Sequence, residues 1–208
     1  MVRTTSSRGH TLTRQKFTAD DLNPYILTPE EREQFRQRIL KARNEGNFTP
    51  IGFDDVIHMP GNQGGSNWGS TAANPGDGTV YVIGFNTPTI IRLLKAGEVR
   101  KTGRGAGEPI KEGRYVTDGF GLYPTIVSPP YTTLTSYDLN RGTIRWQIGL
   151  GDDLRLVGQG IKGTGTAANV KGGLITTATG LVFATGGDHK VHVYDSVDGK
   201  QISEFPLG

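Results

Sequence analysis

Two groups of side chains in this sequence are of types that can bind a metal ion, and both are weak candidates. Asp152 and Asp153 are adjacent carboxylates, but a calcium site needs several converging oxygen ligands, and this pair lies in a turn-like stretch. His189 and His192 are three residues apart, which places them on opposite faces of an extended segment. We therefore expect two ordinary strand histidines and no metal site at either place.

A third group, Gly64-Gly65-Ser66-Asn67-Trp68-Gly69, combines paired glycines with an amide and an indole. Glycine lets a ligand approach the backbone closely, and amide N–H groups suit the polar edge of a planar ligand. The alternative is that Asn67 caps a turn and that Trp68 packs between structural elements. Either role requires a framework that fixes the segment in space.

The composition favours a framework of short strands. The 208 residues include 31 glycines and 11 prolines, which are spread along the chain and suit many short strands joined by turns. The net charge of +3 comes from basic residues interleaved with acidic ones, so we expect no nucleic-acid partner. The chain has no cysteine, which excludes disulfides and thiolate metal sites but leaves the cellular compartment open.

Two stretches of the chain resemble each other, and the aspartates that end their third runs are 57 residues apart. Each has a third short run that ends in Tyr-Asp and a tight turn, at Asp138 and at Asp195. An insertion at about 86–130 separates the second and third runs of the first stretch only. Trp146 follows Asp138 by eight residues, where the second stretch has Ser203, and we expect it to pack between neighbouring repeats. Self-similarity with four short strands per repeat predicts an all-β, partial β-propeller of about two to three four-stranded blades.

The N-terminal part has a different pattern. Residues 1–54 read as an irregular segment that contains one helix at about 29–45. Thr28 and Glu31 form a capping box, and Pro29 occupies the first helical position. Residues 55–208 then form the partial propeller.

Three segments resemble the pyrroloquinoline-quinone (PQQ) dependent dehydrogenases, in particular the glucose and quinate type. They are Pro60–Gly69, Tyr137–Trp146 and Gly172–Phe183, and the resemblance extends over about residues 15–208. It implies an eight-bladed quinoprotein propeller in which Asn67 hydrogen-bonds the quinone on the central axis, with Gly65 and Trp68 beside it. Gly172 takes the equivalent place in the next blade, and Lys171 either pairs with a cofactor carboxylate or is solvated.

The resemblance also implies a function. We expect the C-terminal part of a dehydrogenase that oxidises a sugar, polyol or alcohol and passes electrons to a membrane quinone or a cytochrome. In that family the calcium ligands and the general base come from earlier blades, so we expect the chain to need the missing blades and to be inactive alone. A non-catalytic propeller scaffold and a truncated reading frame are the alternatives. The expected location is periplasmic or membrane-associated on the periplasmic side, although the first residues do not form a signal peptide.

The insertion carries a local basic cluster. Its members are Arg92, Lys95, Arg100, Lys101 and Arg104. The cluster either docks an acidic partner or membrane surface or is a solvated loop face.

Overall fold

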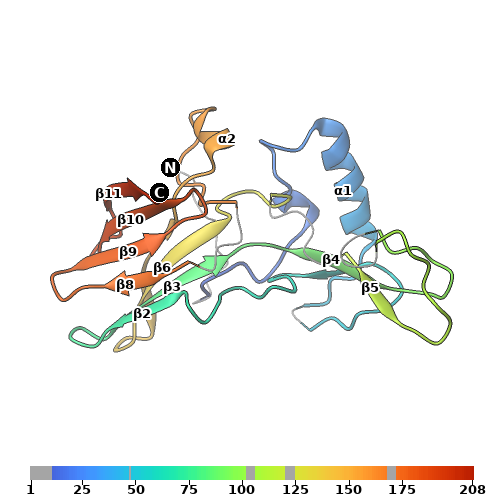
Figure 1. The fold of residues 1–208 in the computed structure, drawn as a ribbon, viewed down its shortest axis with the longest axis horizontal. Coiled ribbons are helices and arrows are strands. Elements are labelled where there is room, and N and C mark those ends of the chain that lie inside the picture. Colours follow the sequence, from blue (N-terminus) through green and yellow to red (C-terminus); the bar gives the residue numbers. More distant parts are fainter. Residues whose placement is uncertain (1–10, 47, 102–105, 120–124, 168–171) are drawn as a thin grey trace. The chain divides into compact units, whose positions relative to one another are not determined.

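The computed structural model describes residues 11–46, 48–101, 106–119, 125–167 and 172–208 (Figure 1). Internal contacts group the chain into two compact units. The first, here the blade unit, comprises Met1–Thr13, Gly65–Asn86 and Pro129–Gly208; the second, here the insertion unit, comprises Arg14–Gly64 and Thr87–Ser128. The expected division into 1–54 and 55–208 stays a prediction.

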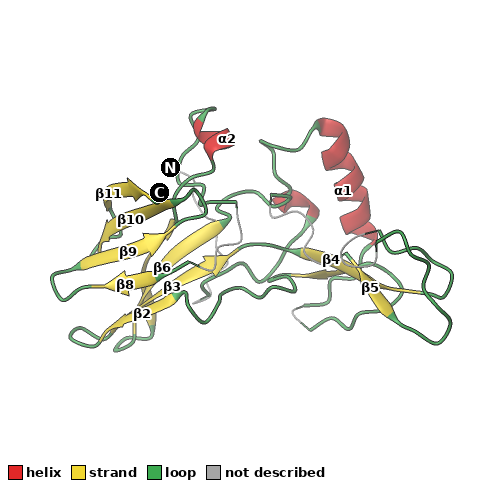
Figure 2. Ribbon diagram, viewed as in Figure 1, coloured by secondary structure: helices red, strands yellow, loops and turns green. Residues whose placement is uncertain are grey.

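The blade unit contains two four-stranded antiparallel sheets, with strand orders β2-β3-β6-β7 and β8-β9-β10-β11 (Figures 1 and 2). The first blade comprises β2 (Thr71–Asn74), β3 (Thr79–Phe85), β6 (Thr132–Asp138) and β7 (Thr143–Gly149). The second blade comprises β8 (Leu174–Thr176), β9 (Leu181–Thr185), β10 (Lys190–Asp195) and β11 (Gln201–Pro206). These meandering sheets are the expected repeats, and the all-β prediction is confirmed.

The two blades share details beyond strand order. The pairing of β6 with β7 shifts register between Ser136 and Tyr137, and the pairing of β10 with β11 shifts between Val193 and Tyr194, 57 residues later. Gly142 and Gly199 close the equivalent turns with positive φ values of 66° and 73°, which glycine adopts without steric cost. The sequence repeat is therefore a structural repeat.

The hydrophobic core of the blade unit lies between the two sheets. Its buried members are Tyr81, Ile83, Phe85, Leu134, Leu150, Leu174, Val182, Ala184 and Tyr194, with Ala72, Trp146 and Ile148 packed against them. The indole Nε1 of Trp146 in the first blade donates to the carbonyl of Ser196 in the second at 3.0 Å. The predicted packing role of Trp146 between neighbouring repeats is confirmed.

The insertion unit combines helices with a small sheet. It contains the 3₁₀ helix η1 (Ala19–Asp21), α1 (Pro29–Lys41) and a three-stranded sheet in the order β1-β4-β5. The strands are β1 (Val56–His58), β4 (Thr89–Leu94) and β5 (Val116–Asp118). The predicted capping box is present, because Thr28 Oγ1 accepts from the Glu31 N–H and Glu31 accepts from the Thr28 N–H. The helix ends at Lys41 rather than near residue 45, since Ala42 already has extended backbone angles.

Among the described residues, no helix has both the length and the apolar character that a membrane crossing requires.

Candidate functional site

A tight turn at residues 67–70 leads into β2, an edge strand of the first blade. The Ser70 N–H donates to the Asn67 carbonyl at 3.1 Å, and Asn67 Oδ1 accepts from the Trp68 N–H at 2.8 Å. Asn67 therefore caps the turn, as the alternative interpretation predicted. Its Nδ2 group makes no hydrogen bond within the part of the chain that the structure describes, so the amide keeps a free donor. The Trp68 side chain is 96% exposed, so it does not pack between blades here.

The segment before this turn is fixed along β3. The Phe85 N–H donates to the Gly65 carbonyl at 2.8 Å, and the Ser66 hydroxyl donates to the Ile83 carbonyl at 2.8 Å. These two bonds hold Gly65 and Ser66 beside the end of a central strand. The position of the Asn67 turn thus follows from the sheet rather than from a free loop.

Ser70 joins the turn to the second blade. Its side chain is fully buried, and its hydroxyl donates to the Gly172 carbonyl at 3.4 Å. Gly173 follows and exchanges bonds with Thr185, whose Oγ1 accepts from the Gly173 N–H at 2.9 Å. The structure therefore brings the predicted residues Gly65, Asn67 and Trp68 to the same place as Gly172.

Two residues that shape this site were not predicted from the sequence. Ser70 and Thr185 were not among the predicted residues, although both hold the glycine segments in place. For Ser70 the sequence did offer a signal, because a small hydroxyl residue directly follows the Gly-rich motif at the start of a strand. Lys171, which was predicted to bind the cofactor, lies outside the described residues.

Glycine leaves open space on this surface. A methyl group added at Gly69 or at Gly173 would meet no atom of the described residues within 4 Å. Packing against this part of the chain therefore requires neither glycine, and both keep the backbone accessible near the starts of β2 and β8.

The acidic pair Asp152 and Asp153 serves a loop. Asp152 Oδ1 accepts from the Thr164 N–H at 2.8 Å, while Asp153 caps the short helix α2 (Leu154–Val157). The hydrogen bond from Arg155 is the main cause of the lowered pKa of Asp153. No cluster of three or more potential metal ligands forms among the residues that the structure describes.

The two histidines have different environments. His192 lies in β10 as expected, is buried, and places Nε2 3.0 Å from Asp188 Oδ2. His189 lies in the preceding turn with φ of 59°, so its expected strand position is wrong. The reason is that the β9–β10 connection is tight, and one residue must take the left-handed conformation to reverse the chain.

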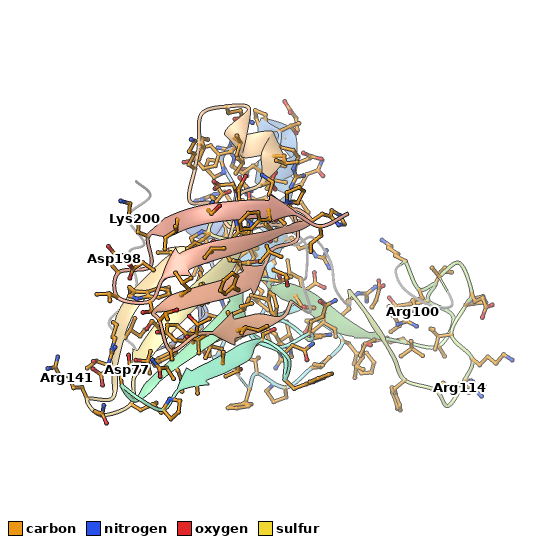
Figure 3. The ribbon with its side chains drawn as sticks, turned by 60° about the vertical axis from the view of Figure 1, so that its left-hand side comes forward. Asp77, Arg100, Arg114, Arg141, Asp198 and Lys200 are labelled. Carbon is orange, nitrogen blue, oxygen red and sulfur yellow. The ribbon has the colours of Figure 1, made fainter. Side chains whose placement is uncertain are left out.

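The basic cluster is partly paired within the insertion unit. Arg92 forms an ion pair with Glu98 at 2.9 Å, and the Lys95 amine lies 5.1 Å from the centroid of the Phe53 ring. Figure 3 shows Arg100 on the insertion, while Arg104 lies outside the described residues. These pairings favour the solvated loop face over a docking patch.

Two consecutive four-stranded antiparallel sheets that pack face to face across an apolar core are the repeating arrangement of a β-propeller. The sequence profile of the glucose, ethanol and alcohol dehydrogenase β-propeller domain, a PQQ family, matches residues 4–208. The chain belongs to this family of PQQ-dependent dehydrogenases. The resemblance found in its motifs is therefore confirmed.

Curated relatives are similar over most of this chain. The quinate/shikimate dehydrogenase (quinone) of Acinetobacter baylyi is 30% identical over 92% of this chain and 26% of that protein. The glycerol dehydrogenase large subunit of Gluconobacter oxydans is 28% identical over 85% of this chain and 27% of its own length. The chain thus spans about a quarter of the length of the curated relatives that it matches.

Solved structures are similar at a lower level of identity. The quinohemoprotein alcohol dehydrogenase from Comamonas testosteroni shares 19% identity, with a TM-score of 0.46, over 74% of this chain and 20% of that structure. A europium-containing methanol dehydrogenase shares 21% identity, with a TM-score of 0.48, over 74% of this chain and 23% of that structure.

The residues at the turn suit the edge of PQQ, a planar tricarboxylate. A cofactor rich in acceptor oxygens needs donors, and the turn offers the unused Asn67 Nδ2 and the exposed indole N–H of Trp68. The open space at Gly69 and Gly173 leaves room for a planar ring system. The donor set therefore fits one edge of the cofactor.

Proposed function

We propose that this chain supplies the cofactor-edge part of a PQQ-dependent dehydrogenase that oxidises a sugar, polyol or alcohol. The observation that carries this proposal is the buried bond from Ser70 to Gly172, which holds the Asn67 turn beside the start of the second blade. A site between two blades is rigid because both sheets position it.

Each residue at the turn has a proposed role. The Asn67 Nδ2 group donates to an oxygen at the edge of the quinone, and Trp68 presents its indole to the cofactor. Gly65 and Gly172 let the backbone approach closely, and Lys171 stays a predicted partner for a carboxylate. When bound, PQQ supplies the acceptor for the two electrons of the oxidation. We assign no catalytic base and no metal ligand to this chain, and the calcium of the complete enzyme is held by residues outside it.

The substrate class and partners are proposed from the relatives. The names of the Acinetobacter and Gluconobacter proteins give quinate or shikimate and glycerol as substrates, and a quinone as acceptor in the first case. A lupanine 17-hydroxylase of Pseudomonas, 24% identical, carries cytochrome c in its name. We infer a polyol or related alcohol as substrate, a membrane quinone or a cytochrome as electron acceptor, and a periplasmic location.

We also propose that this chain alone does not form a complete PQQ site. We expect the purified chain to bind PQQ weakly or not at all, because only one edge of the cofactor is provided for. The test is a fluorescence titration with PQQ, with and without calcium, followed by a dye-linked dehydrogenase assay. Tight stoichiometric binding with turnover would contradict this part of the proposal.

The role of Asn67 is tested in a hybrid enzyme. Residues 4–208 replace the matching quarter of the Acinetobacter baylyi relative, and an active hybrid is the starting point. Loss of a hydrogen bond to a charged or strongly polar acceptor costs about 1.5 to 3 kcal/mol, so we expect Asn67→Ala to weaken PQQ binding at least about tenfold.

A second variant separates binding from turn formation. Asn67→Asp keeps the Oδ1 acceptor for the Trp68 N–H but replaces the Nδ2 donor with a negative charge. We expect it to bind PQQ at least as weakly as the alanine variant, while Asn74→Ala, which removes a turn cap at the other end of β2, leaves affinity unchanged. Normal PQQ affinity of Asn67→Asp would show that Asn67 serves only the turn.

A further inference from the structure

The turn between β9 and β10, residues 186–189, contains one member of a buried hydrogen-bonded pair that has no part in the proposed function so far. The side chain of His192 in β10 is 2% exposed, and that of Asp188 in the turn is 7% exposed. His192 Nε2 lies 3.1 Å from Asp188 Oδ1 and 3.0 Å from Oδ2. Because a carboxylate only accepts hydrogen bonds, Nε2 carries the proton and donates. Loss of either member would leave the other buried without its partner.

Two glycines from distant segments leave room for this pair. A methyl group at Gly151, where φ is 63°, would lie 2.9 Å from His192 Nε2 and 3.0 Å from Asp188 Oδ2. A methyl group at Gly186 would clash with Asp188 Oδ1 and lie 3.0 Å from the same Nε2. Contacts this short force neighbouring atoms to move, so both positions favour glycine. The pair therefore lies directly between the backbone at Gly151 and the β9–β10 turn.

The first blade has no such pair. Thr135 occupies the position equivalent to His192, 57 residues earlier, and its Oγ1 accepts from Gln147 Nε2 at 2.8 Å. The long insertion replaces the short turn that carries Asp188 in the second blade. The blade fold thus forms without a histidine–aspartate pair, so the pair in the second blade has a local reason.

The segment that packs on the pair is the β7–β8 connection, residues 150–173, which carries α2 (Figure 1). Near its start, the Gly151 N–H donates to Tyr194 Oη of β10 at 3.3 Å. Further along, Thr166 Oγ1 accepts from the Gly187 N–H of the turn at 3.1 Å. The connection is therefore anchored to β10 and to the turn, the two elements that the buried pair joins.

The same turn is linked to the end of the connection. Thr185 directly precedes the turn, and its N–H donates to the Gly173 carbonyl at 3.1 Å while its Oγ1 accepts from the Gly173 N–H at 2.9 Å. The preceding residue, Gly172, accepts the bond from Ser70 beside the Asn67 turn. A displacement of the β9–β10 turn is therefore passed through Thr185 to the backbone of the proposed cofactor edge.

We propose that His192 and Asp188 are positioning residues for PQQ, which act by holding the backbone at Gly172 and Gly173 rather than by contact with the cofactor. The effect on PQQ rests on the proposed function, whereas the control of the turn does not. Because the pair acts on one edge of the cofactor and not on the reacting atoms, its loss weakens PQQ binding and leaves the turnover of the loaded enzyme nearly unchanged.

Amide hydrogen exchange in the full chain without PQQ tests the control of the turn. His192→Leu removes the donor but keeps a side chain that fits an apolar core. We expect the amides of Thr185 and Gly187, here the reporter amides, to exchange at least about tenfold faster while those of β3 keep their rates, because the turn opens locally. Asp188→Ala removes the acceptor and should have the same effect, and it is the test variant if the leucine variant does not fold.

Two variants separate positioning from general stability. Thr135→Val removes the buried hydrogen bond at the equivalent position of the first blade and should leave the reporter amides unchanged. His192→Gln keeps a donor for Asp188 but has no counterpart of Nδ1, which lies 3.5 Å from Glu204 Oε2, and should restore slow exchange. The proposal would be overturned by unchanged reporter amides in the His192→Leu and Asp188→Ala variants, by equal acceleration in Thr135→Val, or by a glutamine variant that exchanges as fast as the leucine variant.

PQQ affinity is then measured in the active hybrid enzyme, by reconstitution of the PQQ-free protein at increasing PQQ concentration. We expect His192→Leu or Asp188→Ala to raise the Kd for PQQ about tenfold, as loss of an outer partner does at metal sites, with kcat at saturating PQQ within about twofold of the parent. His192→Gln and Thr135→Val should bind PQQ as the parent does. An unchanged Kd in these two pair variants, in a hybrid that Asn67→Ala does weaken, would overturn this inference alone. An unchanged Kd in all three would contradict the proposed function as well.

Discussion

The two blades keep the same backbone device and differ in the side chains that hold their neighbours. In both, an aspartate ends the third strand and caps the following turn, since Asp138 Oδ1 accepts from the Asn140 N–H and Asp195 Oδ1 accepts from the Val197 N–H. Yet the fourth strand carries Trp146 in the first blade and Ser203 in the second. The two blades therefore share the turn and differ at the fourth-strand position that anchors the first blade to the second.

The charged residues near these turns also differ between the blades; Figure 3 labels Asp77 and Arg141 in the first blade and Asp198 and Lys200 in the second. In the first blade Arg145 lies 3.3 Å from Asp77 and 3.4 Å from Asp138. The equivalent residue of the second blade is Ile202, which is 55% exposed. The ion pairs are thus a feature of one blade and are not required by the repeat.

The largest expected effect comes from removing the anchor between the blades. Trp146→Ala deletes a ring that packs on Tyr81 with centroids 5.8 Å apart and loses the bond to Ser196. We expect the free energy of unfolding to fall by about 3 kcal/mol, measured by urea denaturation. The chain has two tryptophans, and Trp68→Ala is the matched control, expected to change stability by less than about 0.5 kcal/mol. Equal effects of the two substitutions would contradict the blade comparison.

The equivalent glycines Gly142 and Gly199 give a smaller and more selective test. Both have positive φ, so alanine costs about 1 kcal/mol at either position through backbone strain. A methyl group at Gly142 meets no atom within 4 Å, but at Gly199 it would lie 2.8 Å from the Trp146 ring. We expect Gly199→Ala to cost about 1 to 2 kcal/mol more than Gly142→Ala in urea denaturation.

A double substitution checks the origin of that difference. In a Trp146→Ala background the clash at residue 199 is gone, so Gly199→Ala and Gly142→Ala should have similar costs. A difference that persists without the indole would show that it has another cause.

Much of this fold could be predicted from local patterns. The spacing of 57 residues between two Tyr-Asp turns predicted the repeat. An aspartate with a glycine four residues later favours a turn, because the aspartate side chain can accept hydrogen bonds from backbone N–H groups of the turn itself. Thr28 and Glu31 predicted the start of α1 for the same reason, since a capping box is complete within four residues. The Gly-rich motif before β2 predicted the family and the turn that contains Asn67.

Contacts between distant segments could not be predicted. Ser70 meets Gly172 across 102 residues, and its place after the Gly-rich motif does not show which distant segment it will contact. His192 pairs with Asp188 beneath Gly151, so its burial depends on a loop from another part of the chain. The exposure of Trp68 is also a tertiary property, because an aromatic residue after a glycine pair is compatible with either packing or a ligand contact.

The smallest expected effect concerns acid stability and separates the first blade from the second. Burial raises the pKa of Asp138, but the N–H groups of Arg141 and Asn140 and the charge of Arg145 outweigh it, so the folded pKa lies below the usual value. An aspartate with a lowered folded pKa stabilises the fold above its unfolded pKa of about 3.9, and this stabilisation is lost as the pH falls through the folded pKa. Asp138→Asn should therefore lower the urea midpoint at pH 7 and flatten its decline below about pH 4.

Arg145→Ile sharpens this last prediction, because it gives the first blade the residue that the second blade has at the equivalent position. The substitution removes the charge but keeps both backbone N–H donors, so we expect the acid-dependent decline of the urea midpoint to shrink without disappearing. The Asp138 turn would then depend on the backbone bonds that both blades share, with Arg145 as an addition. A decline as flat as that of Asp138→Asn would instead assign the pKa shift to the ion pair alone.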